Sequence, residues 1–156
     1  RGIVRRGFHV LIQAVGYYLL ALPGLLLLSG LLWWGLDQQN PFVIPHLAEA
    51  SALFFFWVLL CAPVIEEVFF REYLLTKLSG SPKFGPWRAC ILTAVLFASL
   101  HGIIAWLPLF YLGLVLGYLR MKTKNLSLVI GIHVLHNLTV VSSQLLLSNS
   151  SSIIAP

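Results

Sequence analysis

The chain has 156 residues, of which 59% are hydrophobic and only 10% are charged. This apolar fraction exceeds what a soluble domain needs to fill one core, so the composition excludes that class and predicts a membrane protein surrounded by lipid. The formal net charge of +5 lies in short segments between apolar runs, so it indicates membrane topology and we expect no nucleic-acid partner.

Five apolar segments are candidates for membrane-spanning helices. A helix needs about 20 apolar residues to cross the hydrocarbon layer, and the candidate spans cover residues 8–36, 47–77, 87–104, 106–119 and 126–147. The fourth span is short, and Pro108 fits its first turn because a missing N–H is tolerated there. The predicted fold class is therefore all-α, a polytopic transmembrane helical bundle of about five spans.

These spans suggest three regions along the chain. Residues 1–46 form an N-terminal transmembrane helix and a non-cytoplasmic loop. Residues 47–147 form a four-helix core that holds the polar residues discussed below, and residues 148–156 form a polar tail.

Basic residues alternate between the two ends of the predicted spans. They precede the first span, are absent from residues 37–46, and follow the second and fourth spans. The positive-inside rule then predicts a cytoplasmic N-terminus, five crossings and a non-cytoplasmic C-terminus. We expect a multi-pass protein of a bacterial cytoplasmic membrane or an organelle membrane.

The second span contains an unusual concentration of acidic residues. Glu66, Glu67 and Glu72 are three of the five acids in the chain and fall within seven positions. Charges at membrane depth are costly and usually functional. Pro63, three residues before Glu66, frees a backbone carbonyl about one turn earlier, which a neighbouring helix or a polar cavity has to satisfy.

Helical periodicity separates the two adjacent glutamates. At about 100° per residue, Glu67 and Arg71 share one face, whereas Glu66 lies about 140° away from Arg71. We therefore expect Arg71 to neutralise Glu67 and to leave Glu66 as the reactive carboxylate. Glu72, nearer the cytoplasmic end, is expected to be a solvated surface charge.

Polar residues on three predicted helices lie at a similar depth. At a rise of about 1.5 Å per residue, Glu66, His101, His133 and Asn137 lie about 14–20 Å from the basic ends of their helices. Phe97 shares a face with His101, as His133 does with Asn137. Histidine suits acid–base chemistry and the asparagine amide suits oxyanion stabilisation, so this set is a candidate catalytic site.

These residues form three motifs that resemble those of a known family. Residues 66–71 resemble the EExxxR motif, residues 97–101 the FxxxH motif, and residues 133–137 the HxxxN motif. The family is the CAAX-protease and bacteriocin-processing (CPBP) family of intramembrane glutamic endopeptidases, also called the abortive-infection family. The resemblance covers about residues 58–140 and implies a helical membrane protease, in some members acting after a prenylated cysteine.

The resemblance also implies a role for each motif residue. Glu66 resembles the general base that activates water, and His101 resembles its partner. His133 and Asn137 resemble the pair that stabilises the tetrahedral oxyanion. The supporting positions correspond to Glu67, Arg71 and Phe97. The implied substrate is a membrane-associated peptide or protein, and we expect no cofactor and no metal.

Three other functions stay open at this stage. Glu66, His101 and His133 are competent zinc ligands, which would suit a metal-dependent membrane hydrolase. A non-proteolytic immunity or assembly factor with the same fold would use the polar cluster to pack helices or to bind a membrane protein partner. A proton or ion pathway would instead spread its polar residues along the membrane normal.

Overall fold

The computed structural model describes residues 2–35, 47, 50–102 and 105–154. The predicted loop at residues 37–46 and the predicted end of the third span at residues 103–104 lie outside these described residues. Within the described ranges, all of the regular secondary structure is helical.

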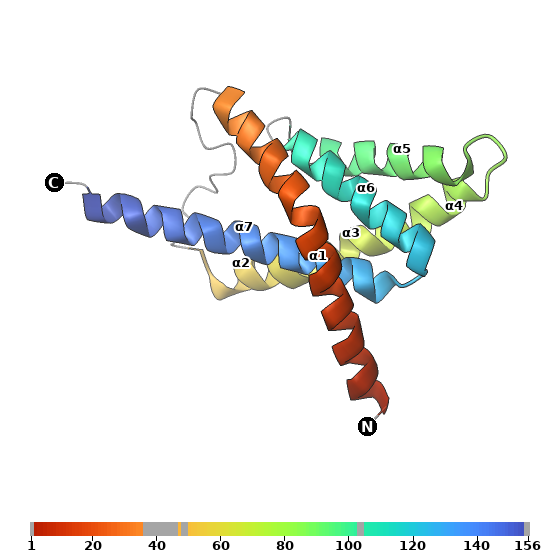
Figure 1. Ribbon diagram of the computed structural model, residues 1–156, viewed down its shortest axis with the longest axis horizontal. Helices are drawn as coiled ribbons and strands as arrows, with labels where there is room; N and C mark the ends of the chain where they lie inside the picture. Colours follow the sequence, from red (N-terminus) through yellow and green to blue (C-terminus); the bar gives the residue numbers. More distant parts are fainter. Residues whose placement is uncertain (1, 36–46, 48–49, 103–104, 155–156) are drawn as a thin grey trace.

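The described residues form five helical rods, shown in chain order from red to blue in Figure 1. The first is α1 (Gly2–Gly35), and the last three are α5 (Gly85–Ser99), α6 (Trp106–Thr123) and α7 (Leu126–Ile154). The second is a continuous rod that consists of α2 (Ala52–Phe56), η2 (Trp57–Cys61), α3 (Ala62–Glu67), η3 (Val68–Leu74) and α4 (Leu75–Ser79). The predicted all-α bundle of about five helices is confirmed.

Three of these rods contain segments long and apolar enough to cross a bilayer, namely Arg6–Leu32, Ala52–Ser79 and Leu126–Leu146. The helix Gly85–Ser99 is apolar but shorter, about 22 Å long at about 1.5 Å per residue, against about 30 Å of hydrocarbon. The third predicted span thus ends earlier than expected, because the chain turns after Ser99 and Gly102 has a φ of 81°. The chain is an integral membrane protein.

Small residues bring α5 and α6 into close contact. A Cβ atom added at Gly117 would lie 2.6 Å from Cys90 Sγ, and one added at Gly113 would lie 3.0 Å from Ala94. Membrane helices use small residues in this way because lipid provides little hydrophobic drive for helix association, so close backbone contact has to supply the attraction. The α5–α6 pair is visible side by side in Figure 1.

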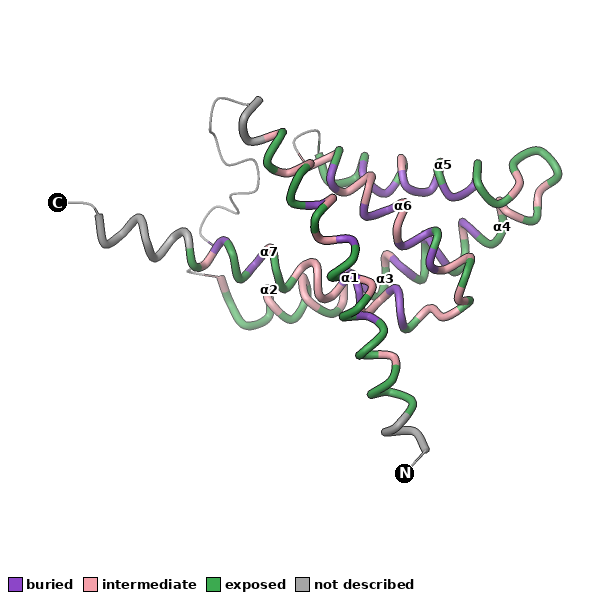
Figure 2. Tube along the Cα trace, viewed as in Figure 1, coloured by how far each residue is buried: buried purple, intermediate pink, exposed green. Residues whose placement is uncertain are grey.

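A second packing centre joins α1 to α6 and α7. Ala14 and Tyr18 of α1 are buried in one cluster with Leu112, Val129 and Ile132. On α1, the buried positions lie in the middle of the helix, where it crosses other helices (Figure 2), while residues 6–9 are exposed. The crossing holds α1 against the part of α7 that carries His133.

The turns α4–α5 and α6–α7 lie toward the same end of the bundle (Figure 1). Close to this end, Arg120 of α6 forms an ion pair with Glu72 of η3, in which Arg120 Nε lies 3.2 Å from Glu72 Oε2. Glu72 was expected to be a solvated surface charge, and the structure adds a partner that the sequence did not reveal. Its side chain is about half exposed, but it links the second rod to α6.

Candidate active site

Glu66 faces two histidines that belong to other parts of the fold. Its Oε2 lies 3.8 Å from His101 Nε2 and 3.7 Å from His133 Nε2. Glu66 comes from α3, His101 from the turn that follows α5, and His133 from α7. The structure therefore brings together three of the four residues predicted to be catalytic, and Glu66 Oε2 has no hydrogen-bond partner among the described residues.

The second nitrogen of each histidine is held by a fixed acceptor. His101 Nδ1 lies 2.8 Å from the carbonyl oxygen of Phe97, and His133 Nδ1 lies 2.9 Å from Glu67 Oε1. Carbonyl and carboxylate oxygens only accept, so we assign a hydrogen to both Nδ1 atoms. Both Nε2 atoms face the same oxygen of Glu66. With the hydrogen on Nδ1, a neutral histidine ring has its lone pair on Nε2.

Glu67 and Arg71 form the ion pair that the i, i+4 spacing predicts. Arg71 Nε lies 3.2 Å from Glu67 Oε2, and both side chains are completely buried. Arg71 also donates to the carbonyl oxygen of Gly113 at 3.4 Å, so it ties the second rod to α6. The sequence did not reveal the additional contact between Glu67 and His133, which lie 66 positions apart.

Phe97 occupies the centre of this cluster and is completely buried. Its ring centroid lies 4.8 Å from that of His101 and 5.6 Å from that of His133. The guanidinium carbon of Arg71 lies 4.5 Å from the same ring. The Phe97 ring thus packs against both histidines and the buried Arg71, and these contacts help to fix their positions.

Asn137 satisfies a backbone carbonyl that Pro63 leaves free. In the π-helical segment η2, Ala62 N–H bonds to Trp57 O five residues earlier. The next bond of this ladder would join residue 63 to Val58 O, but proline has no N–H. Asn137 Nδ2 donates to Val58 O at 2.9 Å, so a neighbouring helix meets the need that Pro63 creates, as the sequence predicts.

This geometry leads to a test of the bond. We expect Asn137→Ala to lower the free energy of unfolding by about 1–3 kcal/mol, because the Val58 carbonyl loses its partner inside the bundle. Pro63→Ala supplies a backbone N–H and should suppress much of this loss in the double variant. Thermal unfolding of the four proteins in detergent measures the coupling, and strictly additive effects would contradict it.

The other histidine of this segment makes a different contact. His136 lies edge-on to Tyr18 of α1, with the ring centroids 6.3 Å apart. It therefore belongs to the contact between α1 and α7. In the part of the chain that the structure describes, no group of three or more His, Cys, Asp or Glu side chains is arranged to hold a metal ion.

Comparisons with known proteins cover the same residues. The family model described as type II CAAX prenyl endopeptidase Rce1-like matches residues 48–139. The membrane-embedded CAAX protease MroQ of Staphylococcus aureus (strain USA300) is 30% identical over 105 residues, or 64% of this chain and 42% of the relative. The chain thus spans less than half of the length of that relative. No solved structure matches the chain.

Proposed function

Because the chain belongs to the Rce1-like family of type II CAAX prenyl endopeptidases, we propose that it is an intramembrane glutamic endopeptidase. It would hydrolyse peptide bonds of membrane-associated substrates with a water molecule activated by Glu66. The observation that carries this proposal is the approach of two histidine Nε2 atoms to a single oxygen of Glu66. The resemblance to the CPBP family is confirmed by the same family match.

In the proposed first step, a water molecule bound beside Glu66 attacks the scissile carbonyl carbon. Separations of 3.7–3.8 Å are too long for direct hydrogen bonds between Glu66 and the histidines. A water molecule beside Glu66 Oε2 and the two Nε2 atoms can form hydrogen bonds that bridge them. Glu66 accepts one proton from the water as the new C–O bond forms and the carbonyl electrons move to its oxygen. The partial exposure of Glu66 and His101 supports access for water and peptide.

The resulting oxyanion needs hydrogen-bond donors. His133 can donate from Nε2 only when it is protonated, because its Nδ1–H is bound to Glu67. In that state Glu66, Glu67, Arg71 and His133 carry two negative and two positive charges, and a cluster of zero net charge is the least costly one at membrane depth. The second N–H of Asn137 is the other proposed donor, since its first N–H is bound to Val58.

In the second step, the peptide C–N bond breaks and the leaving amine takes up a proton. His101 is the proposed proton carrier, because its Nε2 faces Glu66 while Phe97 O holds its Nδ1–H. The proton that Glu66 accepted from water passes through His101 to the amine. Glu66 then regains its charge and the carboxyl product leaves.

Cleavage assays in liposomes test this function, the substrate class and the independence from metal together. We expect the purified chain to cleave a membrane-associated peptide with a C-terminal CAAX sequence, and to retain its rate after treatment with a chelator. A farnesylated peptide and the same peptide with an alkyl anchor show whether a prenyl group is required. Loss of activity on chelation with recovery by Zn²⁺ would favour the metal-dependent hydrolase instead.

The alternative of a non-proteolytic immunity or assembly factor makes a different prediction. Such a protein would cleave none of these peptides, and its biological function would survive replacement of Glu66. We also propose that the end of the bundle formed by the α4–α5 and α6–α7 turns faces the cytoplasm, because the basic residues gather there. The residues concerned are Lys77, Lys83, Arg88, Arg120, Lys122 and Lys124.

A further inference from the structure

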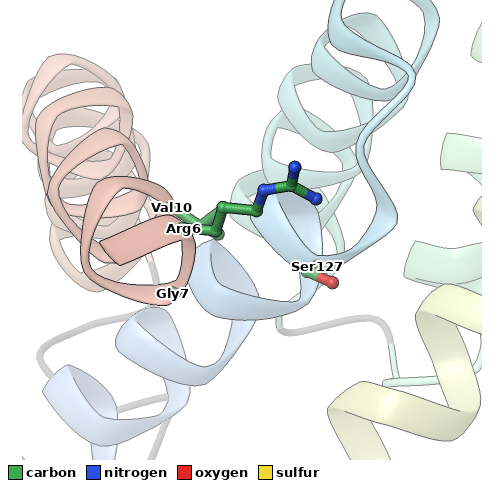
Figure 3. Close-up of a pocket in the computed structure, with 4 residues that line it drawn as sticks. All are labelled: Arg6, Gly7, Val10 and Ser127. Carbon is green, nitrogen blue, oxygen red and sulfur yellow. The ribbon is translucent and has the colours of Figure 1, made fainter. Parts of the chain in front are cut away.

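A hollow of about 430 Å³ lies between the beginnings of α1 and α7. Its walls are formed by Arg6, Gly7 and Val10 of α1 and by Ser127 of α7. A Cβ atom added at Gly7 would meet nothing within 4 Å, so the space beside α1 is open at this point. Figure 3 shows the Arg6 side chain extended from α1 across the beginning of α7, where Ser127 lies.

The hollow lies at the depth where lipid headgroups are found. Two of the apolar membrane-spanning segments begin there, Arg6–Leu32 in α1 and Leu126–Leu146 in α7. The start of an apolar span marks the boundary between hydrocarbon and water. The hollow therefore opens at the membrane surface, with Val10 on its inner side.

The charges around the hollow favour an anion. The Arg6 guanidinium forms no hydrogen bond or ion pair with another described residue, whereas Arg120 is already paired with Glu72. Lys122 and Lys124 lie just before α7 in the sequence, and no acidic residue lines the hollow. A guanidinium presents a planar set of N–H donors that matches two phosphate oxygens, and the Ser127 hydroxyl adds a donor.

We propose that this hollow binds the headgroup phosphate of an anionic phospholipid, with Arg6 and Ser127 as its donors. Anionic phospholipids carry their phosphate at this depth, and basic hollows between transmembrane helices are suited to anionic headgroups. The lipid would connect α1 to α7 near their N-terminal ends. The inference is independent of proteolysis, because none of the residues involved touches Glu66 or its histidines.

Lipid binding to the purified 156-residue chain tests the proposal. Native mass spectrometry in detergent would count the phosphatidylglycerol and phosphatidylcholine molecules that stay bound, and a titration would give the affinity. We expect wild type to bind one phosphatidylglycerol in preference to phosphatidylcholine. Arg6→Gln should weaken this binding by about 10-fold or more, as expected for the loss of a charge-assisted pair of hydrogen bonds.

Lys83→Gln is the matched control, since it removes one positive charge from the turn between α4 and α5 without touching the hollow. It should bind phosphatidylglycerol as wild type does. Arg6→Lys keeps the charge but loses the planar donors and should give an intermediate affinity, which keeps the test valid if Arg6→Gln fails to fold. Equal losses in Arg6→Gln and Lys83→Gln would overturn the proposal in favour of diffuse surface charge.

A free phosphate ion could bind the same donors in place of a lipid headgroup. Inorganic phosphate added to lipid-free protein in detergent should leave the thermal midpoint unchanged, whereas phosphatidylglycerol should raise it in wild type and not in Arg6→Gln. Stabilisation by inorganic phosphate at equal concentration would overturn the assignment to lipid.

Discussion

Glu66→Gln is expected to lower the rate of peptide cleavage by about 10²- to 10⁴-fold, which is the usual contribution of a general base. The amide has nearly the same shape as the carboxylate but cannot take a proton from water. Glu66 makes no direct hydrogen bond to a described side chain, and it is about a quarter exposed, so its replacement should leave the fold intact. Initial rates in liposomes and thermal unfolding of the same sample measure the two effects separately.

Glu72→Gln provides the control for this experiment. It is the same chemical change in the same rod, six positions further on, where the carboxylate pairs with Arg120 and not with the histidines. An exposed pair of this kind contributes little to stability, so we expect the cleavage rate to stay within about twofold of wild type. Full activity in Glu66→Gln would show that water activation has been assigned to the wrong carboxylate.

The sequence was sufficient to predict the helical bundle and much of the charged cluster. The Glu67–Arg71 pair and the Phe97–His101 contact both follow from i, i+4 spacing, because one helical turn brings such residues together. The convergence of Glu66, His101 and His133 followed from the cost of placing polar groups in lipid, combined with helix rise. Each of these inferences depends on local geometry or on depth alone.

Contacts between helices at different rotations could not be predicted in this way. Depth places Glu67 and His133 at one level but does not say which carboxylate His133 faces, and its Nδ1 binds Glu67 while its Nε2 faces Glu66. The π-helical segments on both sides of α3 also shift the helical phase, and an apolar run has no pattern that reveals such turns. Pro63 signalled a freed carbonyl, but not that it belongs to Val58.

The end of α5 shows a related limit. The apolar run continues past Ser99, so hydropathy predicts a longer span, whereas the chain leaves the helix before His101. His101 still reaches the site because its N–H bonds to Ala98 O at 3.1 Å and its ring stays against Phe97. A turn at the end of a helix can thus preserve a contact that was expected from a continuing helix.

Arg71→Met is expected to destabilise the protein by about 3–5 kcal/mol, the usual cost of leaving one partner of a buried ion pair uncompensated. Arg71 and Glu67 are both completely buried, so water cannot solvate the remaining carboxylate. The double variant Glu67→Gln/Arg71→Met removes both charges. It should recover most of the lost stability, because Gln and Met are similar in volume to the Glu and Arg that they replace. Unfolding in detergent, followed for both variants and wild type, measures this recovery.

Cleavage activity should not recover together with stability. In the double variant a neutral amide replaces the carboxylate that accepts from His133 Nδ1. Only Glu66 then remains as a carboxylate beside protonated His133, so this state is less stabilised and the oxyanion has a weaker donor. We expect the cleavage rate to stay about 100-fold or more below wild type. A double variant that regained both stability and activity would limit the Glu67–Arg71 pair to a structural role, and one no more stable than Arg71→Met would show that charge compensation is not what keeps Glu67 buried.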